Sequence, residues 1–130
     1  MIAFRLDTTS GLPPYLQLTQ QVKHALRLGM LGVGDQLPTV KEVVATLAIN
    51  PNTVLKAYRE LEHEGLTESR PGVGTFVVRT LAGSSLASHD ALRRELARWI
   101  RGAQTAGLDS ESIEALFTNT FRDVLKEGAA

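Results

Sequence analysis

The sequence contains no cysteine, and this absence excludes disulfide bonds, thiolate metal sites and a cysteine nucleophile. It also lacks any apolar run approaching the roughly 20 residues that a membrane-spanning helix needs. The first residues, 1–5, do not show the basic-then-apolar order of a secretion signal. Together these absences lead us to expect a cytoplasmic protein with no membrane partner.

An excess of one charge is also missing, because 14 Lys and Arg side chains balance 14 Asp and Glu side chains. A net charge of zero weakens any argument for nucleic-acid binding by bulk electrostatics. If the protein binds DNA, the positive charge that contacts the phosphates must be concentrated in one part of the surface. The composition, 43% hydrophobic and 22% charged, is that of a globular protein. A chain of 130 residues is long enough for one or two small domains.

Groups of residues that would carry catalysis or bind a metal are absent as well. His24, His63 and His89 have no metal-ligand spacing, and no acid pair or Ser/His/Asp set suggests a pocket. Gly72-x-Gly74 is not a nucleotide loop, because no helix follows it directly. We therefore predict that the protein is not an enzyme and has no metal or other cofactor.

The sequence does contain a strong helix pattern at residues 50–64. Asn50 suits the N-cap, and Pro51 suits the first helical position, where its missing N–H would be unpaired in any residue. Apolar spacing predicts one buried face, made of Val54, Ala57, Tyr58 and Leu61. The opposite face carries Asn52, Thr53, Lys56 and Arg59. Such a helix can enter a DNA major groove, although an ordinary amphipathic surface helix is the alternative.

Two elements are expected before this one. Residues 2–6 alternate imperfectly between apolar and polar types and predict a short edge strand. A helix is predicted from Pro14 to about Leu28, with its long polar side chains towards solvent, namely Gln17, Gln20, Gln21 and Lys23.

A short second helix is predicted from the N-cap Thr39 through Leu47. Glu42 stands three residues after Thr39, which completes a capping box. Only residues 48–50 separate this helix from the one that begins at Pro51. Two helices joined by so tight a turn predict a helix-turn-helix.

A β-hairpin is predicted directly after the helix-turn-helix. Gly65 provides a glycine C-cap, and residues 66–70 and 75–78 read as strands joined at 71–74. The glycines at the turn supply the positive φ angles that a hairpin needs. A helix-turn-helix followed by a hairpin is the winged-helix layout.

The small and polar residues 79–88 predict a linker, and two further helices follow it. The first is expected at about 89–102, and the second is capped by Asp109 or Ser110 and stopped by Gly128. We therefore expect two domains, a winged helix-turn-helix at 1–80 and an α-helical hairpin at 81–130. The fold class is mainly α with a small β-wing.

The two C-terminal helices carry apolar stripes too large for the helices to bury against each other alone. We predict that these stripes form a homodimer, through Leu92, Leu96, Trp99, Ile100, Ile113, Leu116, Phe117, Phe121 and Val124. Packing of the stripes onto the winged helix is the alternative.

These features together resemble the GntR family of bacterial winged-helix transcription regulators, over about residues 14–78. The motifs that carry the resemblance are Gly34–Glu42, Asn50–Val54, Lys56-Ala57-Tyr58, Glu60-Leu61-Glu62, Gly65 and Gly72–Val77. The Asn-Pro-Asn-Thr-Val run and the short tail resemble the YtrA-type branch, which has a two-helix dimerisation module. The family usually has serine and arginine where this sequence has Thr39 and Lys41. Lys41 keeps the charge but loses the bidentate fork of arginine.

The side chains expected at the DNA are distributed over the three parts of the winged helix. Asn52 and Thr53 are predicted to read base edges, with local capping as the alternative. Lys41 and Lys56 are predicted to contact phosphates or the groove, with solvated surface lysines as the alternative. Asn50 is predicted both to cap the helix and to contact a phosphate. Two residues have two interpretations each: Thr39 as cap or phosphate contact, and Tyr58 as core or phosphate contact. The wing is expected to act through Arg70, Gly72 and Gly74.

The predicted function is a sequence-specific DNA-binding transcription regulator, a homodimeric repressor that occupies a palindromic operator. The alternative is a winged-helix protein-interaction module without specific DNA binding, which would not need the polar turn at 50–53. A small-molecule effector bound between the C-terminal helices would be an addition to the first function. The tail is small for such a pocket.

Overall fold

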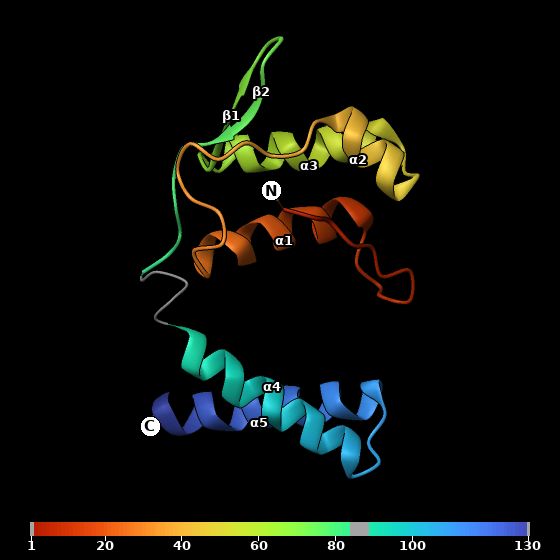
Figure 1. Cartoon of the computed structure of the whole chain (residues 1–130), viewed down its shortest axis with the longest axis vertical. Coiled ribbons are helices and arrows are strands. Elements are labelled where there is room, and N and C mark those ends of the chain that lie inside the picture. The colour runs from red at the N-terminus through yellow and green to blue at the C-terminus, as the bar shows by residue number, and fades with distance from the viewer. Residues whose placement is uncertain (1, 84–88, 130) are drawn as a thin grey trace. The chain divides into compact units, whose positions relative to one another are not determined.

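The computed structural model of the chain describes residues 2–83 and 89–129, with the side chain of residue 129 left out. Two compact units are present, Met1–Ser88 and His89–Ala130 (Figure 1). Part of the predicted linker, residues 84–88, lies outside the described residues. The division into a DNA-binding domain at 1–80 and a dimerisation module at 81–130 stays a prediction.

Three helices form the body of the first unit: α1 (Pro14–Arg27), α2 (Val40–Leu47) and α3 (Pro51–His63). Helix α3 packs against both α1 and α2, so its apolar face lies at the centre of the core. The predicted face of α3 is confirmed, because all four of its residues are buried. The largest fully buried side chains are Leu18, Leu26, Leu37, Leu61, Leu66, Val22, Val54 and Val77.

The segment at residues 2–7 is not the predicted edge strand. The Arg5 N–H donates to Gln21 Oε1 at 2.9 Å, and Gln21 Nε2 donates to the Arg5 carbonyl at 2.6 Å. Two glutamine side chains of α1, Gln21 and Gln17, thus replace the neighbouring strand that would pair with this backbone. The segment carries Phe4 into the core.

The position of Gln17 corrects the sequence prediction that this side chain faces solvent. Gln17 is only 9% exposed, and all of its amide groups are bonded. Its Oε1 accepts from the Asp7 N–H at 2.8 Å, while its Nε2 donates to the carbonyls of Asp7 and Leu12 at 3.0 and 2.9 Å. A buried amide is stable here because each polar atom has a partner.

The turn between α2 and α3 is built from local capping groups, as predicted. The Thr39 hydroxyl accepts from the Glu42 N–H at 3.1 Å, and Asn50 Oδ1 accepts from the Asn52 N–H at 2.8 Å. Ala48 takes a left-handed conformation with φ of 54°, which ends α2 and turns the chain. These caps set where α3 begins and therefore which residues occupy its first turn.

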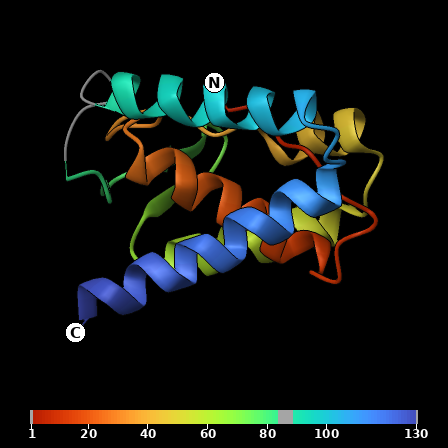
Figure 2. The ribbon, with the colours of Figure 1, turned by 90° about the horizontal axis from the view of Figure 1, so that it is seen from below.

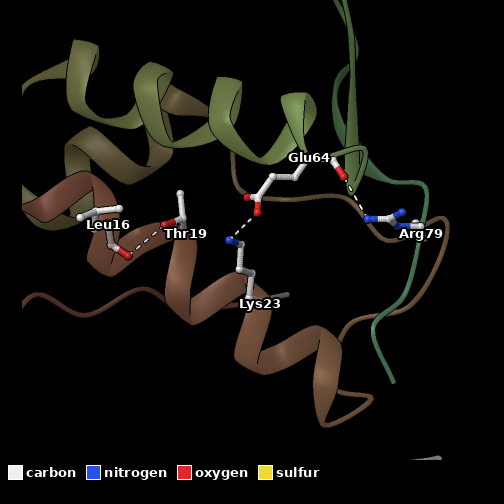
Figure 3. A network of polar contacts seen from close by, with 5 residues as sticks. All are labelled: Leu16, Thr19, Lys23, Glu64 and Arg79. Carbon is white, nitrogen blue, oxygen red and sulfur yellow. Dashed lines mark hydrogen bonds and ion pairs between the residues drawn. The ribbon is translucent and has the colours of Figure 1, made fainter. Parts of the chain in front are cut away.

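The C-terminal end of α3 is held by contacts to α1 and to the segment that follows β2 (Figure 3). Gly65 adopts φ of 76°, and the Leu66 N–H bonds to the Leu61 carbonyl at 3.0 Å, so the predicted glycine C-cap is confirmed. Lys23 of α1 forms an ion pair with Glu64 at 2.7 Å, and Arg79 donates to the Glu64 carbonyl at 3.0 Å. The ion pair is partly exposed and contributes little energy, but it links α1 to the end of α3.

The wing is an antiparallel hairpin of β1 (Thr67–Arg70) and β2 (Gly74–Val77), with Thr67 opposite Val77 (Figure 1). It confirms the predicted hairpin, with ends that differ by one residue. The loop before α2 adds to this sheet, because the Leu37 N–H bonds to the Thr75 carbonyl at 2.9 Å. The Val77 N–H in turn bonds to the Asp35 carbonyl at 2.8 Å. The wing is thereby fastened to the chain that leads into α2.

The second unit is an antiparallel pair of helices, α4 (Asp90–Thr105) and α5 (Ser110–Ala129), as Figure 2 shows. Asp109 caps α5 by accepting from the Ser112 N–H at 2.8 Å. The prediction that Gly128 stops this helix is wrong, since the helix continues to Ala129. None of the helices in the described part of the chain is long and apolar enough to cross a membrane.

The apolar stripes of this unit lie largely at the surface. No described side chain of α4 is buried. The rings of Trp99 and Phe117 lie 6.4 Å apart, and those of Phe117 and Phe121 lie 5.8 Å apart. Eight of the nine side chains predicted to dimerise are exposed, and Ile113 is half-buried; the eight are Leu92, Leu96, Trp99, Ile100, Leu116, Phe117, Phe121 and Val124.

Candidate nucleic-acid interface

The exposed face of α3 brings together polar side chains that the sequence predicts at DNA. Asn52 and Lys56 are exposed and lie one turn apart, and Arg59 follows on the same face. Thr53 is half-buried at the flank. The first turn of the helix contains no acidic residue, so no like charge opposes a phosphate near its positive end. This face can therefore offer an amide to a base edge and cations to the backbone.

Lys56 is oriented by an aromatic ring. Its ammonium nitrogen lies 3.9 Å from the centroid of the Tyr15 ring at the start of α1. Such a cation–π contact contributes about 0.5–1 kcal/mol at an exposed site. The contact holds the charge on the side of α3 that faces α1, which the separation of 41 residues hid from sequence analysis.

The start of α2 contributes Thr39 and Lys41. The Thr39 hydroxyl accepts from the Glu42 N–H and donates to Glu42 Oε1, each at 3.1 Å. Of its two predicted roles, the structure shows the cap. Lys41 is exposed on the first turn of α2.

Tyr58 belongs to the core rather than to the surface of α3. It is 7% exposed, and its hydroxyl donates to the Pro38 carbonyl. Burial, with the Glu42 carboxylate as a smaller cause, raises the pKa of this hydroxyl. The prediction of a phosphate contact is corrected here, because the proton such a contact needs is already donated. Tyr58 instead ties α3 to the residue just before the α2 cap.

The wing presents one cation and two glycines with unusual backbone angles. The Arg70 guanidinium lies 4.5 Å from the centroid of the Phe76 ring on the paired strand. Gly72 has φ of 75° and Gly74 has φ of 145°, which side chains rarely adopt. A Cβ at Gly74 would also overlap the amide of Gln36. The glycines are thus needed to form the turn, whether or not DNA approaches it.

Two further residues of these elements, Gln36 and Leu55, were given no role from the sequence. Gln36 donates to the Val73 carbonyl at 3.2 Å and forms a bridge with Phe76, so it holds the wing to the loop before α2. Nothing in the local sequence signals that contact. Leu55 is an apolar residue on the exposed side of α3. Its three-residue spacing from Asn52 is the sequence feature that places it on the same face as Asn52.

The chain is similar to known proteins over most of its length. The pattern of the bacterial regulatory proteins of the gntR family matches residues 14–77. The HTH-type transcriptional repressor YtrA of Bacillus subtilis (strain 168) is 33% identical over 121 residues, which cover 92% of this chain and 93% of that protein.

Two solved structures share the fold. One is a transcriptional antiterminator from Listeria monocytogenes EGD-e, with a TM-score of 0.58 and 31% identity over 95% of this chain and 92% of that chain. The other is the DNA-binding domain of AraR in complex with operator ORR3, with a TM-score of 0.50 and 27% identity. That match covers 59% of this chain and 93% of the AraR chain. The protein described here therefore belongs to the GntR family of bacterial regulators and is a DNA-binding transcription regulator, not an enzyme.

Proposed function

We propose that this regulator is a homodimeric repressor that occupies an inverted-repeat operator. The observation that carries the proposal is the exposed apolar face of the α4–α5 unit, in a chain that also has a DNA-reading helix. Apolar clusters of this size on a small helical pair mark a contact surface. A twofold contact is the commonest solution, and it presents two α3 helices to two half-sites.

The proposed mode of action rests on a similar protein. The similar protein YtrA is described as a repressor, and the likeness extends over both units of this chain. A winged helix that occupies the operator excludes other proteins from the same DNA. We therefore assign the regulator to repression by steric exclusion of other proteins from the operator DNA.

Within the half-site, we assign base reading to Asn52 and Thr53 at the start of α3. Asn50 caps the helix and adds a phosphate contact, while Lys41 and Lys56 hold the backbone. Arg70 reaches the minor groove from the wing, where Gly72 and Gly74 allow close approach. AraR provides the precedent that a domain of this fold sits on an operator.

The test of the proposal is a selection of random duplex DNA on the purified full-length protein, followed by titration of the selected duplex at two salt concentrations. We expect an inverted repeat with two equivalent half-sites. Recovery of no preferred sequence, with weak and strongly salt-dependent binding, would instead favour a protein-interaction module.

On the selected operator, Asn52→Ala should weaken binding and relax the preference at one base pair of each half-site. A bidentate amide–adenine contact discriminates by about 1–3 kcal/mol, or about 5- to 150-fold. The matched control is Asn119→Ala, which removes the same exposed side chain from α5. Equal affinities of the two variants in a fluorescence-anisotropy titration would remove Asn52 from the reading surface.

Lys41→Ala should weaken binding to every duplex by a similar factor and lower the slope of log affinity against log salt by about one unit. The reason is that one phosphate contact releases about one counterion. Lys126→Ala, at an exposed position of α5, serves as the control and should leave the slope unchanged. A wild-type slope in Lys41→Ala would show that this side chain meets no phosphate.

A further inference from the structure

Leu55 differs from the other apolar side chains of α3 because it is exposed. The other four, Val54, Ala57, Tyr58 and Leu61, are buried. Leu55 is 42% exposed, so the core does not account for a large apolar group at this position. Exposed leucines are common on protein surfaces, and the position of this one is what gives it meaning.

Leu55 shares the exposed face of α3 with polar side chains assigned to DNA. It follows Asn52 by three residues and precedes Arg59 by four, which places the three on neighbouring turns of one face. Glu62, seven residues or about two turns further on, bonds through Oε1 to the Ser69 N–H of β1 at 3.1 Å. Leu55 therefore lies toward the wing side of the exposed face, whereas Lys56, about 100° further around the helix axis, contacts Tyr15 of α1.

The chemistry of the major groove limits what an apolar side chain can read there. Base edges offer hydrogen-bond donors and acceptors, and the apolar group they present is the 5-methyl of thymine. A leucine can bury that methyl and cannot bond to the other edges. One turn of helix separates Leu55 from Asn52, a distance comparable to the step between neighbouring base pairs.

We propose that Leu55 is a specificity-determining residue that packs on the 5-methyl group of a thymine, at or next to the base pair read by Asn52. The inference rests on the proposed function, since it needs α3 in the major groove of a specific operator. It adds an apolar contact to the polar ones and predicts a fixed thymine in each half-site.

The test uses the selected operator with each thymidine replaced in turn by deoxyuridine, which removes the methyl group and nothing else. At one position per half-site we expect the wild-type protein to bind about 3- to 5-fold more weakly, as for the loss of one buried methyl group. Leu55→Ala and Leu55→Gln should bind the normal operator more weakly by a similar or larger factor and be insensitive to that replacement. Both residues are good helix formers, so α3 is retained.

The matched control is Leu28→Ala, which truncates an equally exposed leucine just after α1 and should keep the wild-type response to deoxyuridine. Wild-type binding that is indifferent to every deoxyuridine, or a Leu55→Ala variant with the wild-type response, would overturn the inference. Either result leaves the operator and the proposed function intact. Failure of the proposed function is distinct, because then no operator is selected at all.

Discussion

We expect Phe117→Asp to convert the proposed homodimer to a monomer and to weaken binding to the proposed two-half-site operator roughly 100- to 10,000-fold. Phe117 lies at the centre of the exposed aromatic cluster, between Trp99 and Phe121. In a dimer, the second α3 binds its half-site at a high effective concentration, and a monomer loses that advantage. A carboxylate in the middle of an apolar contact would have to be buried without a partner, which is strongly unfavourable.

The measurement is light scattering of the full chain together with anisotropy titration on the whole operator and on a single half-site. Asn119→Asp is the matched control, because it adds the same charge to the exposed surface of α5, two residues further along. We expect Phe117→Asp to bind the whole operator no better than a half-site. If the variant remains a dimer with wild-type affinity, the apolar face of α4 and α5 is not the dimer interface.

A second variant separates dimerisation from folding of the α4–α5 unit. Phe117→Ala removes the ring without adding charge, and it should shift the monomer–dimer equilibrium in the same direction by a smaller amount. Binding to a single half-site should be unchanged in both variants, since α3 belongs to the other unit. A parallel loss of half-site binding would show that the substitution damages the winged helix.

Local physical rules were enough to predict most of the fold. Thr39, Asn50, Pro51 and Gly65 lie where their capping preferences require, because a cap depends only on residues within one turn. The alternation of helix and hairpin followed from periodicity in the same way. The prediction that Gly128 ends α5 is wrong, because a glycine near a helix end costs only about 1 kcal/mol and the helix continues to Ala129.

The parts that sequence could not reveal depend on pairs far apart in the chain. Tyr58 donates to the Pro38 carbonyl across 20 residues, and Gln21 bonds to the Arg5 backbone across 16. Periodicity predicts whether a side chain faces the core, but it does not predict which backbone group that side chain bonds to. Of the elements that carry the candidate site, the helix α3 and the hairpin of the wing were predicted from the sequence, whereas the contact of Lys56 with Tyr15 required the structure.

Gln17 shows most clearly how such distant contacts stabilise the fold. We expect Gln17→Ala to lower the free energy of unfolding of the winged-helix unit by about 2–3 kcal/mol. The variant loses three hydrogen bonds, each contributing about 0.5–1.5 kcal/mol net. It also leaves the Asp7 N–H without its side-chain partner, while the Asp7 carbonyl keeps the Ser10 N–H, and it frees the segment that carries Phe4 into the core. At roughly 4–8 °C per kcal/mol for a unit of this size, the melting temperature should fall by about 10–20 °C.

Native-state hydrogen exchange of the α1 amides of Val22 and Leu26 measures this loss in the full chain, because both residues lie in the buried stripe of the helix. Gln20→Ala is the matched control, an exposed glutamine on the same helix, and should change stability by less than about 0.5 kcal/mol. Gln17→Glu should be destabilising as well, because a carboxylate has no N–H to donate to the Asp7 and Leu12 carbonyls. Equal stability of Gln17→Ala and Gln20→Ala would mean that water replaces the three bonds at no net cost.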